Sequence, residues 1–214
     1  MLDKSVKHYR VIMIREDLRD IEEYPLQKGY RFSLFQAGDE KSWADIEASV
    51  GEFESLERAY DHFMKEFEDK MDELKERCFF VEIETGEKVA TAMAWYGYLD
   101  GKLLPRIHWV AVKEEHQGRG LCKALISRVL SRFVELGYTG TAYLTTQTWS
   151  YKAIHIYQKF GFIPYDDGKK KVFTGSNEED QRDFHMAWDI IHEKISLYEN
   201  AKKRKGLTTI RRGT

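Results

Sequence analysis

The sequence has little of several features that would assign a protein class at once. It contains two cysteines, three prolines and no apolar run of about eighteen residues, the length a membrane-spanning helix needs. Cys78 and Cys122 do not make a disulfide framework, which fits a reducing compartment. The first residues also lack the apolar segment of a secretion signal. We therefore expect a cytoplasmic protein without a membrane partner.

The chain as a whole is nearly neutral, but its charges are unevenly distributed along the sequence. The net charge is −2, which argues against nucleic acid as a main partner. Residues 39–77 carry 14 acidic and 6 basic side chains. Their simplest explanation is the solvated surface of two helices, and the alternative is an acidic rim that attracts a cationic substrate. Residues 202–212 are basic, which is more typical of a frayed terminus than of a binding arm.

Three motifs that bind phosphates or metals are also absent. No Gly-x-x-x-x-Gly-Lys-Ser/Thr run occurs, so a P-loop is excluded. The Gly-x-Gly-x-x-Gly dinucleotide fingerprint fails because its sixth position, counted from Gly118, is Lys123. The histidines and cysteines show no His-x-x-x-His or Cys-x-x-Cys spacing, so we expect no metal site.

What the sequence does contain is a glycine loop between a strand and a helix. A β-branched run ends at Val112, Gly118 and Gly120 flank Arg119, and an amphipathic helix begins at Leu121. Such a turn leaves backbone N–H groups without intrahelical partners at the positive end of the helix dipole. Because glycine has no Cβ, a ligand can approach the backbone closely. The pattern predicts a site for a phosphate or pyrophosphate.

Two segments of this region resemble one family. Gln117-Gly-Arg-Gly-Leu-Cys122 resembles the Gln/Arg-x-x-Gly-x-Gly/Ala loop of the GNAT superfamily of N-acetyltransferases. Ser150-Tyr-Lys-Ala-Ile-His-Ile-Tyr-Gln-Lys-Phe-Gly-Phe162 resembles its Asn-x-x-Ala-x-x-Leu-Tyr-x-x-x-Gly-Phe signature, with Ser150 in place of asparagine. Cys122 and Glu114 are mild departures, at positions where small residues and proline are usual. The resemblance covers about residues 80–165.

The resemblance implies an α/β fold with a mixed, largely antiparallel sheet, helices on both faces and a splay between the two central strands. Acetyl-coenzyme A would lie in the splay as co-substrate, with its pyrophosphate on the glycine loop and its pantetheine arm on the main chain of the strand before the loop. The residues expected to contact it are Val110, Ala111, Val112, Gln117, Gly118, Arg119, Gly120, Leu121, Cys122 and Ser150.

Two residues are candidates for proton transfer. Tyr157 matches the family tyrosine that points at the thioester sulfur, and a phenol near pKa 10 can protonate a leaving thiolate. By pattern alone Tyr157 would be a core residue of the stripe formed by Ala153, Ile156 and Phe160. His108 is the candidate base, because strand alternation puts it on the same face as Val110.

Both candidates have alternatives. A buried histidine that serves only packing is an equal alternative for His108, and Glu114, Glu115 and His116 are further candidates for the base. The side chain of Arg119 either contacts a phosphate or points to solvent while its backbone binds. Cys122 is more simply a small packing residue than a reactive thiolate.

Periodicity predicts the elements around this region. We expect strands at 11–14, 31–35, 78–83, 88–98, 106–112 and 141–146, and helices over 43–50, 56–74, 121–134 and 151–160, the last with Ser150 as N-cap. Two strands near 163–173 and 184–188 would close the sheet before a final helix at 190–203. The expected division is an extension (1–30), an acetyltransferase domain (31–190) and a C-terminal helix with a basic tail (191–214).

The sequence thus predicts an acetyl-coenzyme-A-dependent N-acetyltransferase that acts by direct attack in a ternary complex. Its acceptor would be a small-molecule or peptide primary amine, and the acidic 39–77 segment favours a cationic one. A non-catalytic acyl-coenzyme A sensor or partner module is the alternative. A longer acyl chain and a homodimer through the C-terminal elements are compatible with the sequence.

Overall fold

The structure is a computed structural model that describes residues 2–166 and 177–211, without the side chains of 177–181 and 205–211. Its strands are β1 (Arg10–Arg15), β2 (Tyr30–Leu34), β3 (Cys78–Ile83), β4 (Lys88–Leu99), β5 (Lys102–Val112), β6 (Ala142–Gln147) and β7 (Ile163–Pro164). Its helices are α1 (Glu40–Ser49), α2 (Leu56–Phe67), α3 (Met71–Arg77), α4 (Leu121–Glu135), α5 (Tyr151–Lys159) and α6 (Asn177–Arg211), with 3₁₀ turns η1 (Glu68–Lys70), η2 (Glu114–His116) and η3 (Thr148–Ser150).

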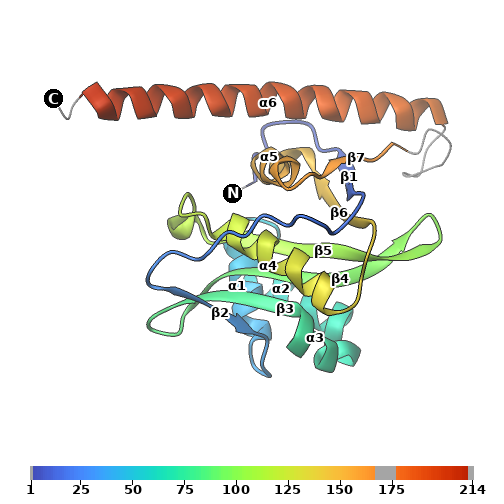
Figure 1. The fold of residues 1–214 in the computed structure, drawn as a ribbon, viewed down its shortest axis with the longest axis vertical. Helices are drawn as coiled ribbons and strands as arrows, with labels where there is room; N and C mark the ends of the chain where they lie inside the picture. The colour runs from blue at the N-terminus through green and yellow to red at the C-terminus, as the bar shows by residue number, and fades with distance from the viewer. Residues whose placement is uncertain (1, 167–176, 212–214) are drawn as a thin grey trace.

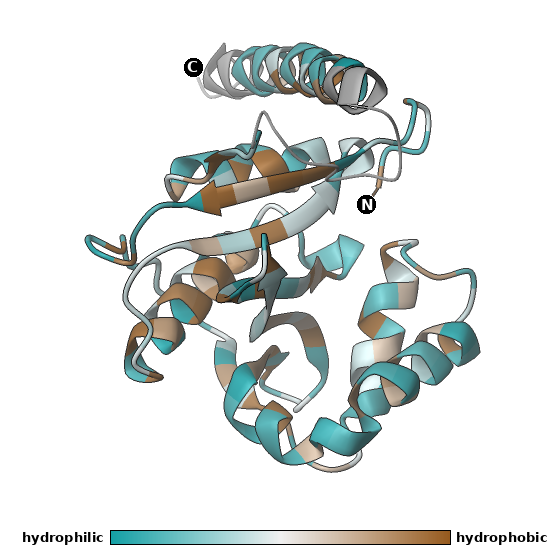
Figure 2. Ribbon diagram, turned by 90° about the vertical axis from the view of Figure 1, so that its right-hand side faces the viewer, coloured by the Kyte–Doolittle hydropathy of each residue, from teal (hydrophilic) through white to brown (hydrophobic). Residues whose placement is uncertain are grey.

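The described strands form one mixed sheet in the order β2-β3-β4-β5-β6-β1-β7. All neighbouring pairs are antiparallel except β5 and β6, which are parallel and are joined through α4. Helices cover both faces: α4 lies in front of the sheet in Figure 1, and α1 and α2 lie behind it. Figure 2 looks along the sheet, with α4 to the left and α1 and α2 to the right. The fold class predicted from the sequence is therefore confirmed.

The central strands stay together only briefly. Arg106 pairs with Tyr143 and Ile107 with Leu144, and the described pairing of β5 with β6 stops there. Residues 108–112 of β5 continue alongside β4 alone. The side of β5 that faces β6 therefore presents unpaired backbone groups, which need another partner if they are buried. This divergence is the splay that the family resemblance implies.

Each face of the sheet has its own hydrophobic core. On the α4 face, Leu125, Ile126 and Val129 are fully buried with residues of β3, β4 and β5. On the opposite face, Trp43 of α1 and Phe63 of α2 are fully buried against the same strands. The two cores hold β3, β4 and β5 from both sides, so the carboxyl end of β5 has a fixed position.

The prediction of two closing strands after α5 is wrong where the structure describes it. Only Ile163–Pro164 forms a strand, and part of the first predicted strand lies outside the described residues. Residues 184–188 are helical and belong to α6. The position beside β6 is taken by β1, which pairs with β6 over six residues and has β7 on its other side. β1, from the N-terminal part of the chain, therefore supplies the backbone hydrogen-bond partners of β6. The prediction had closed the sheet with segments after α5.

The predicted helix over 56–74 is interrupted. Residues 68–70 form the 3₁₀ turn η1, which divides it into α2 and α3. A 3₁₀ turn changes the angular spacing between residues on either side of it. Phe67 and Leu74 are both fully buried in the same core despite that change. The apolar stripe was read correctly, but its periodicity did not reveal the break.

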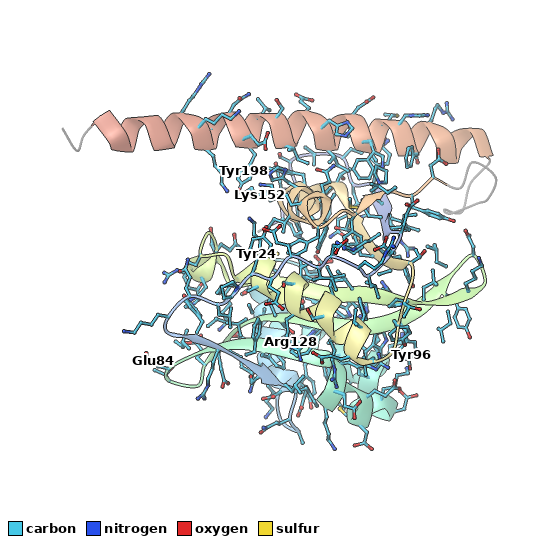
Figure 3. All side chains as sticks on the ribbon, in the orientation of Figure 1. Tyr24, Glu84, Tyr96, Arg128, Lys152 and Tyr198 are labelled. Atoms are coloured by element: carbon cyan, nitrogen blue, oxygen red, sulfur yellow. The ribbon has the colours of Figure 1, made fainter. Side chains whose placement is uncertain are left out.

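The final helix is longer than predicted and begins earlier. α6 runs from Asn177 across the top of the molecule in Figure 1, above α5. It is largely hydrophilic (Figure 2), but Trp188 and Ile191 are buried against the core. Figure 3 shows Lys152 of α5 and Tyr198 of α6 facing each other, with the Lys152 ammonium 5.7 Å from the ring centre. α6 thus covers α5; the division of the chain into domains remains a prediction.

Candidate active site

The glycine loop lies between η2 and the first turn of α4. Gly118 and Gly120 have φ angles of +77° and +81°, a region that L residues rarely adopt, and Gly120 is the N-cap of α4. A Cβ added to either glycine would meet no atom within 4 Å. The first N–H groups of α4, beginning at Leu121, have no intrahelical acceptor. Open space at positive-φ glycines beside free N–H groups fits an anion such as a pyrophosphate.

Side chains of the loop hold it in place. The Gln117 amide donates to the carbonyl oxygen of Val112 over 2.9 Å, which ties the loop to the end of β5. The exposed Arg119 guanidinium donates to the Glu115 carbonyl over 3.2 Å. His116 Nδ1 lies 2.9 Å from the Tyr30 hydroxyl of β2. The Arg119 side chain therefore turns back along the loop, and the backbone of the loop is what faces the open space.

A β-bulge lies in β5 where the pairing with β6 has ended. Met93 is opposite His108 and Thr91 is opposite Ala111, so Ala92 alone faces both Trp109 and Val110. Trp109 has a φ of +47°, an uncommon conformation for a residue with a side chain. Backbone strain of this kind is typical of functional sites.

The bulge corrects one sequence prediction. Strand alternation predicts that His108 shares a face with Val110, but the extra residue reverses the alternation. Val110 and Val112 pack on the α4 side, whereas His108 lies with Trp109 on the side of α1 and α2. A candidate base at His108 is therefore on the other face of the sheet from those two valine side chains.

His108 is buried and held by a carboxylate of α2. Its Nε2 lies 2.8 Å from Glu66 Oε1, and the Trp109 indole N–H donates to Glu66 Oε2 over 3.1 Å. Burial lowers the pKa of His108 to about 4 despite the hydrogen bond to Glu66, which works in the opposite direction. The pKa of Glu66 is lowered to about 2 by hydrogen bonds from His108 and Trp109, although burial alone would raise it. His108 is thus a neutral imidazole that donates Nε2–H to an ionised Glu66.

Tyr157 occupies the other side of the site. It lies on α5, is 6% exposed, and packs in the core that contains α4. Burial raises the pKa of Tyr157 well above 10, and the carboxylates of Glu47 and Glu52 raise it further. The phenol is therefore protonated throughout the physiological range. The charged groups that act on His108 are Glu66, Arg106 and His62, so the two predicted catalytic residues lie in different electrostatic surroundings.

Two smaller predictions concern Cys122 and Ser150. Burial raises the pKa of the Cys122 thiol to about 12, which favours the packing role over a reactive thiolate. Ser150 precedes α5, but its side chain makes no capping hydrogen bond. Ser150 therefore occupies the predicted N-cap position of α5, but without the side-chain bond of a typical cap, because it ends the 3₁₀ turn η3 with φ −96° and ψ 25° and not with extended backbone.

Two carboxylates that act on Tyr157 were not among the residues predicted from the sequence. Glu47 is 3% exposed on the buried side of α1. Glu52 follows α1 and accepts hydrogen bonds from the Gln147 side chain at the end of β6, over 3.3 Å to each oxygen. Glu47 stands four residues after Trp43, where the apolar period of the helix calls for a core residue. A charged residue at a core position of the helix was the sequence signal that could have identified Glu47.

Two further properties hold for the part of the chain that the structure describes. No group of three or more His, Cys, Asp or Glu side chains there is placed to hold a metal ion. None of the helices described is both long and apolar enough to cross a bilayer.

The chain belongs to the GNAT family of acetyltransferases. The family model described as "Acetyltransferase (GNAT) family" matches residues 42–162, which include most of α1, the bulged strand, the glycine loop and α5. Membership supports acyltransferase activity in general. A search of curated proteins found no match.

Solved structures share the fold at low sequence identity. A GCN5-related N-acetyltransferase from Sphaerobacter thermophilus has 20% identity and a TM-score of 0.54 over 73% of this chain and 48% of its own. A GNAT-family acetyltransferase from Colwellia psychrerythraea has 9% identity and a TM-score of 0.56 over 75% and 55%. One from Ralstonia eutropha JMP134 has 19% identity and a TM-score of 0.53 over 69% and 100%. The chain thus spans about half the length of the first two.

Substitution of His108 by glutamine tests the buried neutral imidazole. In the unfolded chain His108 takes up a proton near its ordinary pKa of 6.5, whereas in the folded protein it does so near 4. The unfolded state therefore binds more protons in this window, and stability falls as the pH drops from about 6.5 to about 4. His108→Gln removes this contribution, so the urea midpoint should change less between pH 7 and pH 5 than in the wild type.

Exposed His185 provides the matched control, and His185→Gln should keep the wild-type pH dependence. If His108→Gln also keeps it, the histidine is not buried in its neutral form.

Proposed function

We propose that the protein transfers an acetyl group from acetyl-coenzyme A to a primary amine by direct attack in a ternary complex. The observation that carries this proposal is the end of β5–β6 pairing after Ile107 and Leu144, directly before the glycine loop of α4. Unpaired strand backbone suits an amide-containing arm, and free helical N–H groups suit a pyrophosphate. One molecule that carries both groups is an acyl-coenzyme A.

The residues present fit that co-substrate. Gly118 and Gly120 leave space beside the N-terminus of α4, while Val110 and Val112 lie on the strand that borders the divergence. The loop backbone would hold the phosphates, and the main chain of β5 would orient the arm. Alignment of amine and thioester supplies the largest share of the acceleration, about 7–11 kcal/mol in favourable cases.

Tyr157 would act on the leaving group. Its phenol stays protonated because its pKa is raised by burial, so it can give a proton to the thiolate as the carbon–sulfur bond breaks. An amine that has lost its proton can attack the thioester without a covalent enzyme intermediate. The acceptor would be a small-molecule or peptide amine, and a cytoplasmic location and a homodimer remain predictions.

Substitution of Gly120 by glutamate tests the glycine loop. The new carboxylate would occupy the open space and repel a pyrophosphate, so acetyl-coenzyme A affinity measured by titration calorimetry should fall at least about a hundredfold. Gly101→Glu is the matched control, because Gly101 also has a positive φ of +74° and open space, at the far end of β5. It carries the same backbone strain, of about 1–2 kcal/mol, and should leave the affinity within about twofold of the wild type.

If both Gly120→Glu and Gly101→Glu lose acetyl-coenzyme A binding, backbone strain explains the loss and the loop assignment is not supported. A wild-type protein that binds neither acetyl-coenzyme A nor longer acyl forms would contradict the proposal.

Substitution of Tyr157 by phenylalanine separates catalysis from ligand sensing. Phenylalanine keeps the packing beside Phe162, whose ring centre lies 6.2 Å from that of Tyr157, and removes only the hydroxyl. If the hydroxyl protonates the thiolate, kcat should fall tens-fold or more while acetyl-coenzyme A affinity is retained. Release of free coenzyme A thiol measures the rate, and Tyr98→Phe at an exposed site is the control.

Unchanged turnover would exclude Tyr157 as the acid. Binding of acetyl-coenzyme A without transfer to any amine would instead favour the alternative function, a non-catalytic acyl-coenzyme A sensor.

A further inference from the structure

Glu47 is a buried carboxylate without a visible structural role. It is 3% exposed and shares the inner side of α1 with Trp43 and Ala44, which are fully buried. No described group forms a hydrogen bond with its Oε1. Burial of a carboxylate oxygen without a hydrogen bond is costly, so a native example calls for an explanation.

Glu47 lies beside a second carboxylate at the diverging strands. The Glu52 N–H donates to the Glu47 carbonyl over 3.2 Å, so the two residues join through the turn after α1. The Gln147 amide binds the Glu52 carboxylate at 3.3 Å and fixes it at the end of β6. Tyr157 of α5 lies within the electrostatic reach of both glutamates. The turn after α1 and the contact with Gln147 therefore place two carboxylates at the end of β6, and both act on the pKa of Tyr157.

Two lysines beside α1 are paired with other carboxylates. Lys88 binds Asp39 over 2.6 Å, and Lys113 binds Asp45 over 2.7 Å. The histidines that α2 and β5 present on this side, His62 and His108, bind Glu66. The remaining titratable neighbours of Glu47 are Glu52, Tyr157 and the buried thiol of Cys78 on β3. Within the described residues, no positive side chain forms an ion pair with Glu47, so an ammonium group would complement its charge.

We propose that Glu47 accepts the proton of the acceptor's ammonium group and, with Glu52, selects acceptors whose reactive amine is cationic. This inference rests on the proposed transfer to an amine. The Glu47 carboxylate takes one proton from R–NH₃⁺ and leaves neutral R–NH₂. The nitrogen then bonds to the acetyl carbon, the carbon–sulfur bond breaks, and Tyr157 protonates the thiolate. As the amide forms, the nitrogen loses a second proton. Of this proton and the one on Glu47, one returns to Tyr157 and the other is released to water.

The surroundings of Glu47 suit this role better than those of His108. Burial and the nearby charge of Glu52 raise the pKa of Glu47 well above 4.5, which makes its carboxylate a stronger base than an exposed one. Burial lowers the pKa of His108 to about 4, which makes the imidazole a weaker base than usual. If Glu47 is the base, its substitution should change the pH profile of the reaction; if His108 is the base, substitution of His108 should do so.

The test is the pH dependence of kcat/KM for acetyl transfer to a panel of primary amines that includes n-butylamine, 2-phenylethylamine and putrescine. Glu47→Gln should lower kcat/KM at least about a hundredfold and remove the acid limb of the profile, with acetyl-coenzyme A affinity retained. Glu52→Gln should move the acid limb to lower pH, because the charge that raises the pKa of Glu47 is gone. Exposed Glu57→Gln is the matched control and should match the wild type.

Four outcomes would overturn the inference. Glu47→Gln with activity within threefold and an unchanged acid limb contradicts it, as does loss of that limb in His108→Gln but not in Glu47→Gln. If Glu47→Gln does not fold, an acid limb in Glu52→Gln at the wild-type pH contradicts it. A wild-type protein that binds acetyl-coenzyme A but acetylates no amine overturns both this inference and the proposed function, and is thereby distinguished from the other three.

Discussion

The separation of β5 from β6 is the constraint on which the rest of the site depends. Parallel strands would normally continue their ladder, but here pairing ends after Ile107 and Leu144. The bulge at Trp109 follows at once, and its positive φ shows a backbone held away from regular strand geometry. Two cores clamp β5 from opposite faces, so the unpaired backbone cannot close on β6 without disturbing buried residues. Packing on both faces of the sheet therefore keeps β5 and β6 apart at the site.

That separation gives each face of the sheet a different task. The α4 face carries the glycine loop, whose backbone has the open space and positive φ angles that an anion needs. The α1–α2 face carries carboxylates: Glu66 holds His108 and Trp109, while Oε1 of Glu47 has no hydrogen-bond partner among the described residues. Tyr157 lies on α5, within reach of the charges of Glu47 and Glu52. In the proposed reaction, the co-substrate is held from one face and the amine is deprotonated from the other.

The sequence was sufficient where local chemistry decides structure. Gly118 and Gly120 predicted a turn into a helix. The strand before it ends at Val112 as predicted but begins four residues earlier, and the strand after it lies one residue from its predicted bounds. It was insufficient where partners are distant in the chain. Residues 184–188 were predicted to help close the sheet, but they belong to α6, and β1 occupies the position beside β6. His108 was placed on the wrong face because one bulge residue reverses alternation, and no pattern in Trp109 or Val110 announces a bulge. Glu47 was overlooked because a helix stripe was read for apolar residues only.

The central claim is that the diverging strand and the glycine loop together bind acetyl-coenzyme A. Amide hydrogen exchange of the protein with and without acetyl-coenzyme A measures this directly, because bound N–H groups exchange more slowly. The account predicts added protection at residues 108–112 and 118–123, with β2 and the exposed part of α6 unchanged. Protection confined to other elements, or binding without protection at either segment, would contradict it.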